Sequence, residues 1–325
     1  MSRLWIAGVL AVVAGCSSFE DEDIVIDLRV LAIAATPPEQ VVAIDLSAPQ
    51  NPVQLLQQLV PTRVCALVTD PAFERRVHYR FTLCVYGDGA RCGDVMAPLD
   101  SGTIEDPDTA PLVQTQLCTS VEPNGNLLGV LTETLEGDPF AGLGGLDYLV
   151  QLSVGGEGDE PARDAFAAKT LRVAPKIPVS REANLNPTLD GIEASLGEAA
   201  PVRLALGRCV DQAQPLEIAP NTRIKLTPIE APSARESYVV PTIDGRTMMF
   251  TESLTYQWLA TAGGFSQGST GGTRDISGSF PDLFTEYRAP NADDLDGPTD
   301  IQLWIVQRDE RYGAMWYETC VRVTP

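Results

Sequence analysis

Short apolar or alternating segments between turn residues limit the fold of this 325-residue chain more than any other feature. Such segments occupy residues 64–68, 77–85, 148–154 and 169–173, with Gly, Pro or Asp nearby. Period-two alternation between turn residues is typical of β-strands. The 27 Gly and 25 Pro favour many turns and few long helices. The sequence therefore predicts an all-β protein.

The same pattern occurs twice along the chain and in the same order. Three pairs of segments correspond: 77–81 with 254–258, 149–154 with 301–306, and 171–175 with 321–325. Both copies end in an apolar-Arg-Val-x-Pro strand, which indicates a tandem duplication. We expect a first domain at 28–175 and a second at 176–325. The Pro-rich segment 175–178 is interpreted as an extended linker, because proline restricts itself and the residue before it.

The second copy carries the clearest likeness to a known fold. Its features are, in order, Tyr256-x-Trp258, Gly263-Gly264-Phe265, the segment 287–290, and the strand 301–306 followed by Arg308-Asp309. They resemble immunoglobulin-like or PKD-like β-sandwiches, in which a Trp of a central strand lies under a disulfide. The resemblance implies two tandem Ig-like β-sandwich domains. Cys209 and Cys320 lie near the ends of the second domain, which departs from the antibody pattern and favours a generic sandwich.

Two Leu-rich regions do not follow the strand pattern. Residues 126–135 and 140–146 predict a short helix or packed loop inserted in the first sandwich, and residues 52–60 have helical spacing. We interpret both regions as packing against the core.

The amino terminus has the parts of an export signal. Arg3 is followed by the uncharged apolar run 4–14, about half the length of a membrane-spanning helix. The segment Val13-Ala14-Gly15-Cys16 resembles the lipobox of bacterial lipoproteins. The resemblance implies signal-peptidase recognition of Val13, Ala14 and Gly15, cleavage before Cys16, and fatty acyl chains on Cys16. An ordinary cleaved signal that contains a cysteine is the alternative.

The residues after Cys16 predict a tether. Residues 16–27 are polar and include the acidic run 20–23, whose like charges keep a chain extended. In bacterial lipoproteins, an Asp after the lipidated cysteine is typical of retention in the inner membrane. Ser17 occupies that position here, so the resemblance favours the outer membrane of a two-membrane bacterium. We therefore expect a lipid-anchored protein of the cell envelope.

Six cysteines remain after Cys16, an even number that predicts disulfides in an exported chain. Cys84 and Cys92 flank a turn-rich loop and are expected to pair. Cys65 with Cys118, and Cys209 with Cys320, would follow, although the connectivity of the first four stays open. Zinc ligation is disfavoured, because the sequence has no Cys-x-x-Cys and a single His.

Charge and motif content exclude several function classes. The net charge of −21, without a basic patch, argues against nucleic acid as a partner. His78 is the sole histidine and lies on an alternating strand, so a His-based triad is disfavoured. The sequence contains no nucleophile elbow, phosphate-binding loop or His-Glu-x-x-His. We expect a protein that is not an enzyme, with an exported hydrolase as the least favoured alternative.

An acidic cluster in the second domain raises the question of calcium. The members are Asp293, Asp294, Asp296 and Asp300. Ca²⁺ takes several oxygen ligands, which an Asp-rich turn supplies, but the run lacks the complete EF-hand pattern. A calcium site is one interpretation, and a solvated loop is the other. No other cofactor is expected.

These observations favour a non-catalytic binding or structural module of the cell envelope. The membrane would be contacted through the lipid, and the partner would be an envelope protein or a polysaccharide. The expected binding surface comprises the loops 263–274 and 291–300. A carbohydrate-binding lipoprotein is the alternative, with Trp258, Trp304 and Trp316 as stacking faces, although Trp258 and Trp304 lie within strands and are expected in the core.

Overall fold

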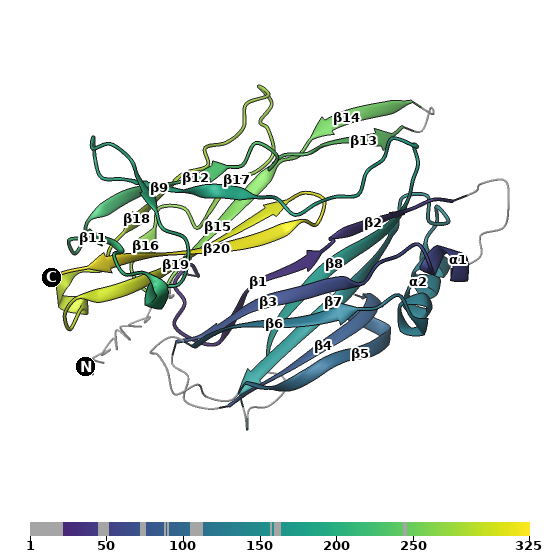
Figure 1. Cartoon of the computed structure of the whole chain (residues 1–325), viewed down its shortest axis with the longest axis horizontal. Coiled ribbons are helices and arrows are strands. Elements are labelled where there is room, and N and C mark those ends of the chain that lie inside the picture. The colour runs from purple at the N-terminus through teal and green to yellow at the C-terminus, as the bar shows by residue number, and fades with distance from the viewer. Residues whose placement is uncertain are drawn as a thin grey trace, which may run out of the picture.

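Two β-sandwiches lie side by side in the computed structural model (Figure 1). The structure describes residues 22–44, 52–71, 76–87, 89, 91–104, 113–156, 158, 164–242 and 246–325. Almost all regular structure is β, as expected for two tandem Ig-like sandwiches. The segment 1–15, predicted to be a signal, and Cys16 lie outside the described residues. Within the described residues, no helix is long and apolar enough to cross a membrane.

The first sandwich packs a three-stranded sheet on a five-stranded sheet. The smaller sheet has the order β1 (Arg29–Thr36), β3 (Thr62–Asp70), β6 (Val113–Val121). The larger has the order β2 (Glu39–Val42), β8 (Ala165–Pro175), β7 (Leu146–Gly156), β4 (Val77–Tyr86), β5 (Cys92–Ile104). Alternate residues of each strand, such as Phe81, Leu83 and Val150, fill the core between the sheets.

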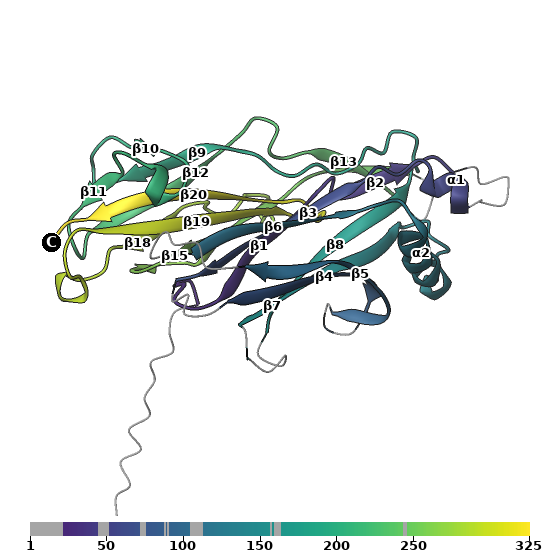
Figure 2. The same ribbon diagram turned by 60° about the horizontal axis from the view of Figure 1, so that its bottom comes forward.

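Two short helices cover one end of this sandwich (Figure 2). They are α1 (Pro52–Leu56) and α2 (Gly125–Gly137), which lie in the two Leu-rich regions. The Asn124 side chain caps α2 by accepting from the amides of Asn126 and Leu127. Leu127 and Val130 of α2 are buried in the core, so the helix packs against it as expected.

The second sandwich pairs two five-stranded sheets. One has the order β10 (Val202–Leu204), β9 (Leu189–Ser195), β12 (Arg223–Glu230), β18 (Thr285–Arg288), β16 (Gly264–Phe265). The other has the order β11 (Leu216–Ile218), β20 (Ala314–Val323), β19 (Thr299–Asp309), β15 (Leu254–Ala260), β17 (Ser269–Gly271). A separate hairpin, β13 (Ser237–Pro241) with β14 (Thr247–Thr251), projects from this sandwich.

The internal repeat is visible in the sheet order. The three corresponding segments form β8-β7-β4 in the first sandwich and β20-β19-β15 in the second. In each case a short strand joins the edge in parallel, β2 on β8 and β11 on β20, while the other pairings are antiparallel. The two halves therefore share the order of these strands as well as a sequence pattern.

Three disulfides join the six cysteines that follow Cys16. They are Cys65–Cys118 between β3 and β6, Cys84–Cys92 between β4 and β5, and Cys209–Cys320 between a short 3-10 turn and β20. These are the expected pairs. None of the three bridges two facing sheets as in antibody domains, which agrees with a generic sandwich.

The two sandwiches meet through an apolar junction. Leu31 and Leu67, from the outer face of the β1-β3-β6 sheet, pack with Leu259, Trp304 and Val306 of the second sandwich. Trp304 is fully buried there, and its Nε1 donates to Gln114 of β6 at 3.0 Å. The Trp304 indole is buried between the two sandwiches, and burial of a large aromatic side chain stabilises the junction in the same way as it stabilises a domain core.

Candidate functional site

His78 lies on the outer face of the first sandwich, in a pocket of about 800 Å³. Its Nε2 is 3.6 Å from Asp164 Oδ2, and the Ser153 hydroxyl donates to the same carboxylate oxygen at 2.6 Å. Asp164 therefore contacts both side chains, and the Ser153 hydroxyl points to Asp164 and not to the His78 imidazole. A nucleophile and base in hydrogen-bond contact, as hydrolytic triads need, are not formed by these three residues.

Two carboxylates of the acidic cluster have local partners. Asp294 accepts from the backbone and side chain of Asn291, and Asp300 holds Arg322 through two contacts of 2.6 and 2.9 Å. No group of three or more Asp, Glu, His or Cys side chains suited to a metal occurs in the described part of the chain. The calcium interpretation of Asp293, Asp294, Asp296 and Asp300 stays a prediction, and two of the four carboxylates, Asp294 and Asp300, already have local partners.

The segment 263–274 is structured, contrary to the expectation of a loop. It supplies an edge strand to each sheet, β16 beside β18 and β17 beside β15. Phe265 packs against Trp258 and Tyr287 of the core. The segment does meet 291–300, since Gly263, Ser266, Asn291 and Asp294 line one pocket of about 370 Å³.

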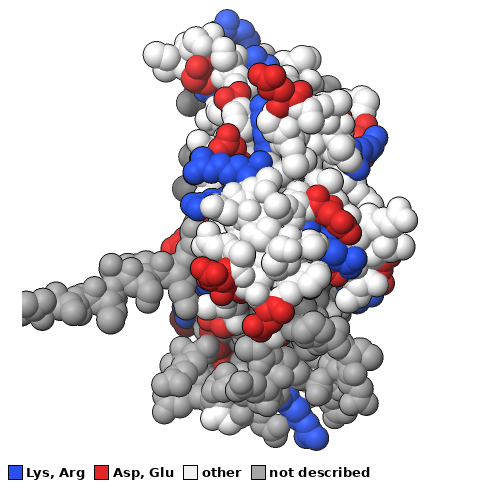
Figure 3. Space-filling view, turned by 90° about the vertical axis from the view of Figure 1, so that its left-hand side faces the viewer, with Lys and Arg blue, Asp and Glu red and all other residues white. Residues whose placement is uncertain are grey.

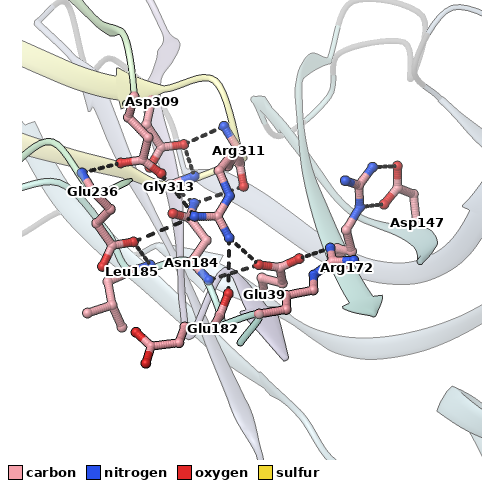
Figure 4. Close-up of polar contacts among 12 residues, drawn as sticks. Glu39, Asp147, Arg172, Glu182, Asn184, Leu185, Glu236, Asp309, Arg311 and Gly313 are labelled. Atoms are coloured by element: carbon pink, nitrogen blue, oxygen red, sulfur yellow. Dashed lines mark hydrogen bonds and ion pairs between the residues drawn. The ribbon is translucent and has the colours of Figure 1, made fainter. Parts of the chain in front are cut away.

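The largest polar cluster lies elsewhere, along the junction of the sandwiches. Glu39 of β2 is 3% exposed, yet its carboxylate binds two guanidinium groups, Arg181 at 2.7 Å and Arg311 at 2.8 Å. The backbone N–H of Asn184 donates to the same carboxylate at 2.9 Å. Figure 4 shows Glu39 and Arg311 pointing toward each other, from β2 and from the β19–β20 turn. These ion pairs and the hydrogen bond compensate for the loss of hydration of the buried Glu39 carboxylate.

Arg311 connects Glu39 to further carboxylates of the second sandwich. Its Nη1 lies 3.4 Å from buried Glu252 and 3.9 Å from Glu236, and its guanidinium stacks 4.7 Å above the Tyr238 ring. Asp309 shapes the turn that carries Arg311, because its Oδ1 accepts from the amides of Arg311 and Gly313, both at 2.7 Å.

A second group of contacts continues the cluster toward β8. Arg172 holds Asp147 through two hydrogen bonds of 2.6 and 2.7 Å, and the Tyr312 hydroxyl donates to Asp147 at 3.0 Å. Lys169, which is buried, donates to the backbone carbonyl of Tyr312. Two cations from the first sandwich thus hold the β19–β20 turn of the second.

Burial shifts the pKa of several groups in this cluster. Burial raises the pKa of Glu252 to about 7, with nearby Asp309 acting in the same direction, and burial also raises the pKa of Asp309. Burial lowers the pKa of Lys169 to about 8. These groups lie among ion pairs and hydrogen bonds that join the two sandwiches. We therefore interpret the cluster as a structural contact between domains.

A groove with an accessible indole borders the same junction. Trp316 lines a pocket of about 420 Å³ with Gln114, Gln116, Arg208 and Glu318. Burial raises the pKa of Glu318, whose Oε2 lacks a hydrogen-bond partner among the described residues. Trp258 and Trp304 are fully buried, as expected, so neither offers a stacking face.

The junction residues were not predicted from the sequence. The only local signals are that Glu39 and Gln40 interrupt an apolar stretch and that 308–311 is a dense run of charge. Nothing in the sequence indicates that these segments, about 270 residues apart, are partners; Arg311 and Glu39 differ by 272 in position.

Comparison with known proteins shows no family for this chain. No protein-family model and no curated protein matches it. Among solved structures it is similar to a red sea bream transglutaminase, at 8% identity and a TM-score of 0.23, over 93% of this chain and 32% of that one. It is also similar to the C-terminal domain of the Streptococcus agalactiae AgI/II polypeptide BspA, at 7% identity and a TM-score of 0.18, over 88% of this chain and 99% of that one. The chain thus spans about a third of the transglutaminase, and scores this low carry no argument about activity.

We predict that Arg311→Ala lowers the free energy of unfolding by about 3–5 kcal/mol, because it leaves Glu39 and Glu252 buried with fewer partners. Urea denaturation followed by circular dichroism measures this change. Arg322→Ala is the control, since it removes a solvent-accessible pair with Asp300 and should move the midpoint little. Equal effects of the two variants would contradict the structural role of the junction cluster.

We also predict that Glu252→Gln flattens the pH dependence of stability between about pH 5 and 7. The folded Glu252 binds a proton in this window and the unfolded chain does not, so wild-type stability falls as pH rises. The variant lacks this contribution. Urea midpoints measured from pH 5 to 8 test the prediction, with exposed Glu133→Gln as control. Parallel profiles for wild type and Glu252→Gln would refute it.

Proposed function

We propose that the chain is a lipid-anchored, non-catalytic module of the bacterial cell envelope, most consistent with the outer membrane. The observation that carries the proposal is the use of cysteine. Of seven cysteines, six form three disulfides, and Cys16 is the one left for a thioether to lipid. Disulfides persist in oxidising compartments outside the cytoplasm, and Cys16 follows the lipobox-like Val13-Ala14-Gly15.

The form of the body supports a binding or structural role. A sandwich alone names no ligand, because function depends on the groups placed on it. Here the charged side chains of the junction serve to hold two domains together. His78, Ser153 and Asp164 do not form a nucleophile–base pair. A fixed two-domain body outside the membrane would present surfaces to an envelope protein or a polysaccharide.

Metabolic labelling with a fatty-acid probe tests the anchor. The wild-type protein should carry the probe and fractionate with membranes, and Cys16→Ser should lose both properties because the acylated thiol is gone. Ser17→Ala is the matched control and should keep the label. An unlabelled wild-type protein, or label that persists in Cys16→Ser, would end the proposal.

Carbohydrate binding is a second candidate, favoured by the groove beside Trp316. One partly buried indole lies among amide, guanidinium and carboxylate groups that can form hydrogen bonds with hydroxyls. The unpartnered Oε2 of Glu318 would accept a hydrogen bond from such a hydroxyl.

Under this second candidate, Trp316→Ala should weaken binding to immobilised envelope polysaccharide by about tenfold, roughly the value of one aromatic contact. Binding isotherms with quenching of Trp fluorescence provide the measurement. Phe166→Ala, which removes an exposed aromatic ring elsewhere on the molecule, should bind like wild type. Unchanged affinity in Trp316→Ala would exclude the groove as the sugar site.

A further inference from the structure

The first described residues pair with the second sandwich before the chain enters the first. Ala260 at the end of β15 donates to Asp23 O at 2.9 Å, and Val25 donates to Ala260 O at 2.8 Å. Ile24 and Ala260 form a parallel β-bridge. The chain then crosses to β1. The amino-terminal segment is therefore attached to the domain that comes last in the sequence.

Side-chain packing fixes this attachment. Val25 is 1% exposed and lies in the junction core with Leu259 and Trp304. Gly268, whose carbonyl accepts from the Trp258 amide, leaves room for Asp23, since a Cβ there would lie 2.0 Å from the Asp23 carboxylate. The segment 23–25 is thus part of the folded body and not of the tether.

The remaining tether is short. Cys16 and Asp23 are seven residues apart, which span at most about 25 Å even when fully extended. An acylated Cys16 would therefore keep Ala260 close to the lipid surface. From the order of domains alone, only the first sandwich would be expected next to the anchor. The pairing with Ala260 places the second sandwich there as well, since Val25 packs with residues of both sandwiches.

Ala260 lies toward one end of the molecule. Its partner in β19 is Leu303, so β19 continues past it to Thr299 and the turn 291–298. The carboxyl terminus and β11 lie at this end, whereas α1, α2 and the β13–β14 hairpin extend toward the other (Figures 1 and 2). We name the first the anchor end, formed by residues 260–264, 289–298 and Pro325.

We propose that the anchor end faces the lipid bilayer and that the helices and the β13–β14 hairpin point away from it. This inference rests on the proposed lipid anchor. The anchor end would contact the bilayer surface, because the tether is short and is attached to the body at Ala260.

Charge supports an upright orientation. Seen from the left-hand side of Figure 1, Lys, Arg, Asp and Glu are scattered among uncharged residues on the described surface, without a continuous basic area (Figure 3). The net charge of −21 also disfavours contact of a long side of the molecule with anionic head groups. The lipid, rather than a basic patch, would hold the protein at the membrane.

The hairpin provides the competing arrangement. Met248, Met249 and Phe250 of β14 are 53%, 75% and 40% exposed, and exposed apolar side chains of this kind can enter a bilayer. Met249 is eleven residues from Ala260 along β14 and β15, a path of up to about 35 Å. Insertion of the hairpin would require the molecule to lie flat.

Energy transfer to labelled lipid distinguishes the two arrangements. Acylated protein is placed in vesicles that carry an acceptor dye on the lipid head groups, with a donor on Asp296→Cys at the anchor end, on Met249→Cys in the hairpin, or on Phe140→Cys beyond α2. We expect severalfold higher transfer from position 296 than from 249 or 140. Equal transfer from 249 and 296, or higher transfer from 249, would overturn the orientation.

Two controls keep the outcomes separate. Mass spectrometry of the vesicle-bound samples reports acylation, so its absence defeats the proposed function, while acylation with the reversed transfer pattern defeats only the orientation. Thermal melting of each labelled variant confirms that the fold is retained. Insertion of fifteen Gly/Ser residues after Ser17 should lower transfer from position 296, and no change would show that the tether does not set the distance.

Discussion

The buried carboxylate of Glu39 is the constraint on which the two-domain structure depends. A charge that is 3% exposed is stable only with partners, and these come from the linker and the second sandwich. Separating the sandwiches would leave Glu39 without Arg311 and would expose Trp304 and Leu67 to water. The polar contacts fix the geometry of the junction, and the apolar contacts stabilise it.

The strands and disulfides could be predicted because their signals are local. The alternation at 77–85 lies within β4, and the Leu-rich 126–135 lies within α2. Cys84 and Cys92 are eight residues apart around a turn, which makes pairing the simplest outcome. The repeat of segments along the chain is matched in the structure by the shared sheet order β8-β7-β4 and β20-β19-β15. Each of these inferences needs only neighbouring residues or a comparison of the chain with itself.

The candidate site could not be predicted in the same way, because its contacts join distant positions. Nothing near Glu39 indicates Arg181 or Arg311, and nothing near Ile24 indicates Ala260. The interpretation of 263–274 failed for a related reason. The Gly and Ser residues suggested a loop. Instead, β16 and β17 pair with the edges of two different sheets, and Phe265 packs against Trp258. The partners of the acidic turn, Asn291 for Asp294 and Arg322 for Asp300, are likewise not revealed by composition.

The bridge between Ile24 and Ala260 has a consequence for biogenesis. The two residues are separated by most of the chain, so the amino-terminal segment emerges from the ribosome long before its partner strand is made. Synthesis at about 5–20 residues per second leaves an interval of tens of seconds. In that interval residues 23–25 lack the strand that receives them, β15 of the second sandwich, and Leu31 and Leu67 of the first sandwich remain uncovered. Closure of the molecule is thus a late event that waits for the carboxyl-terminal half.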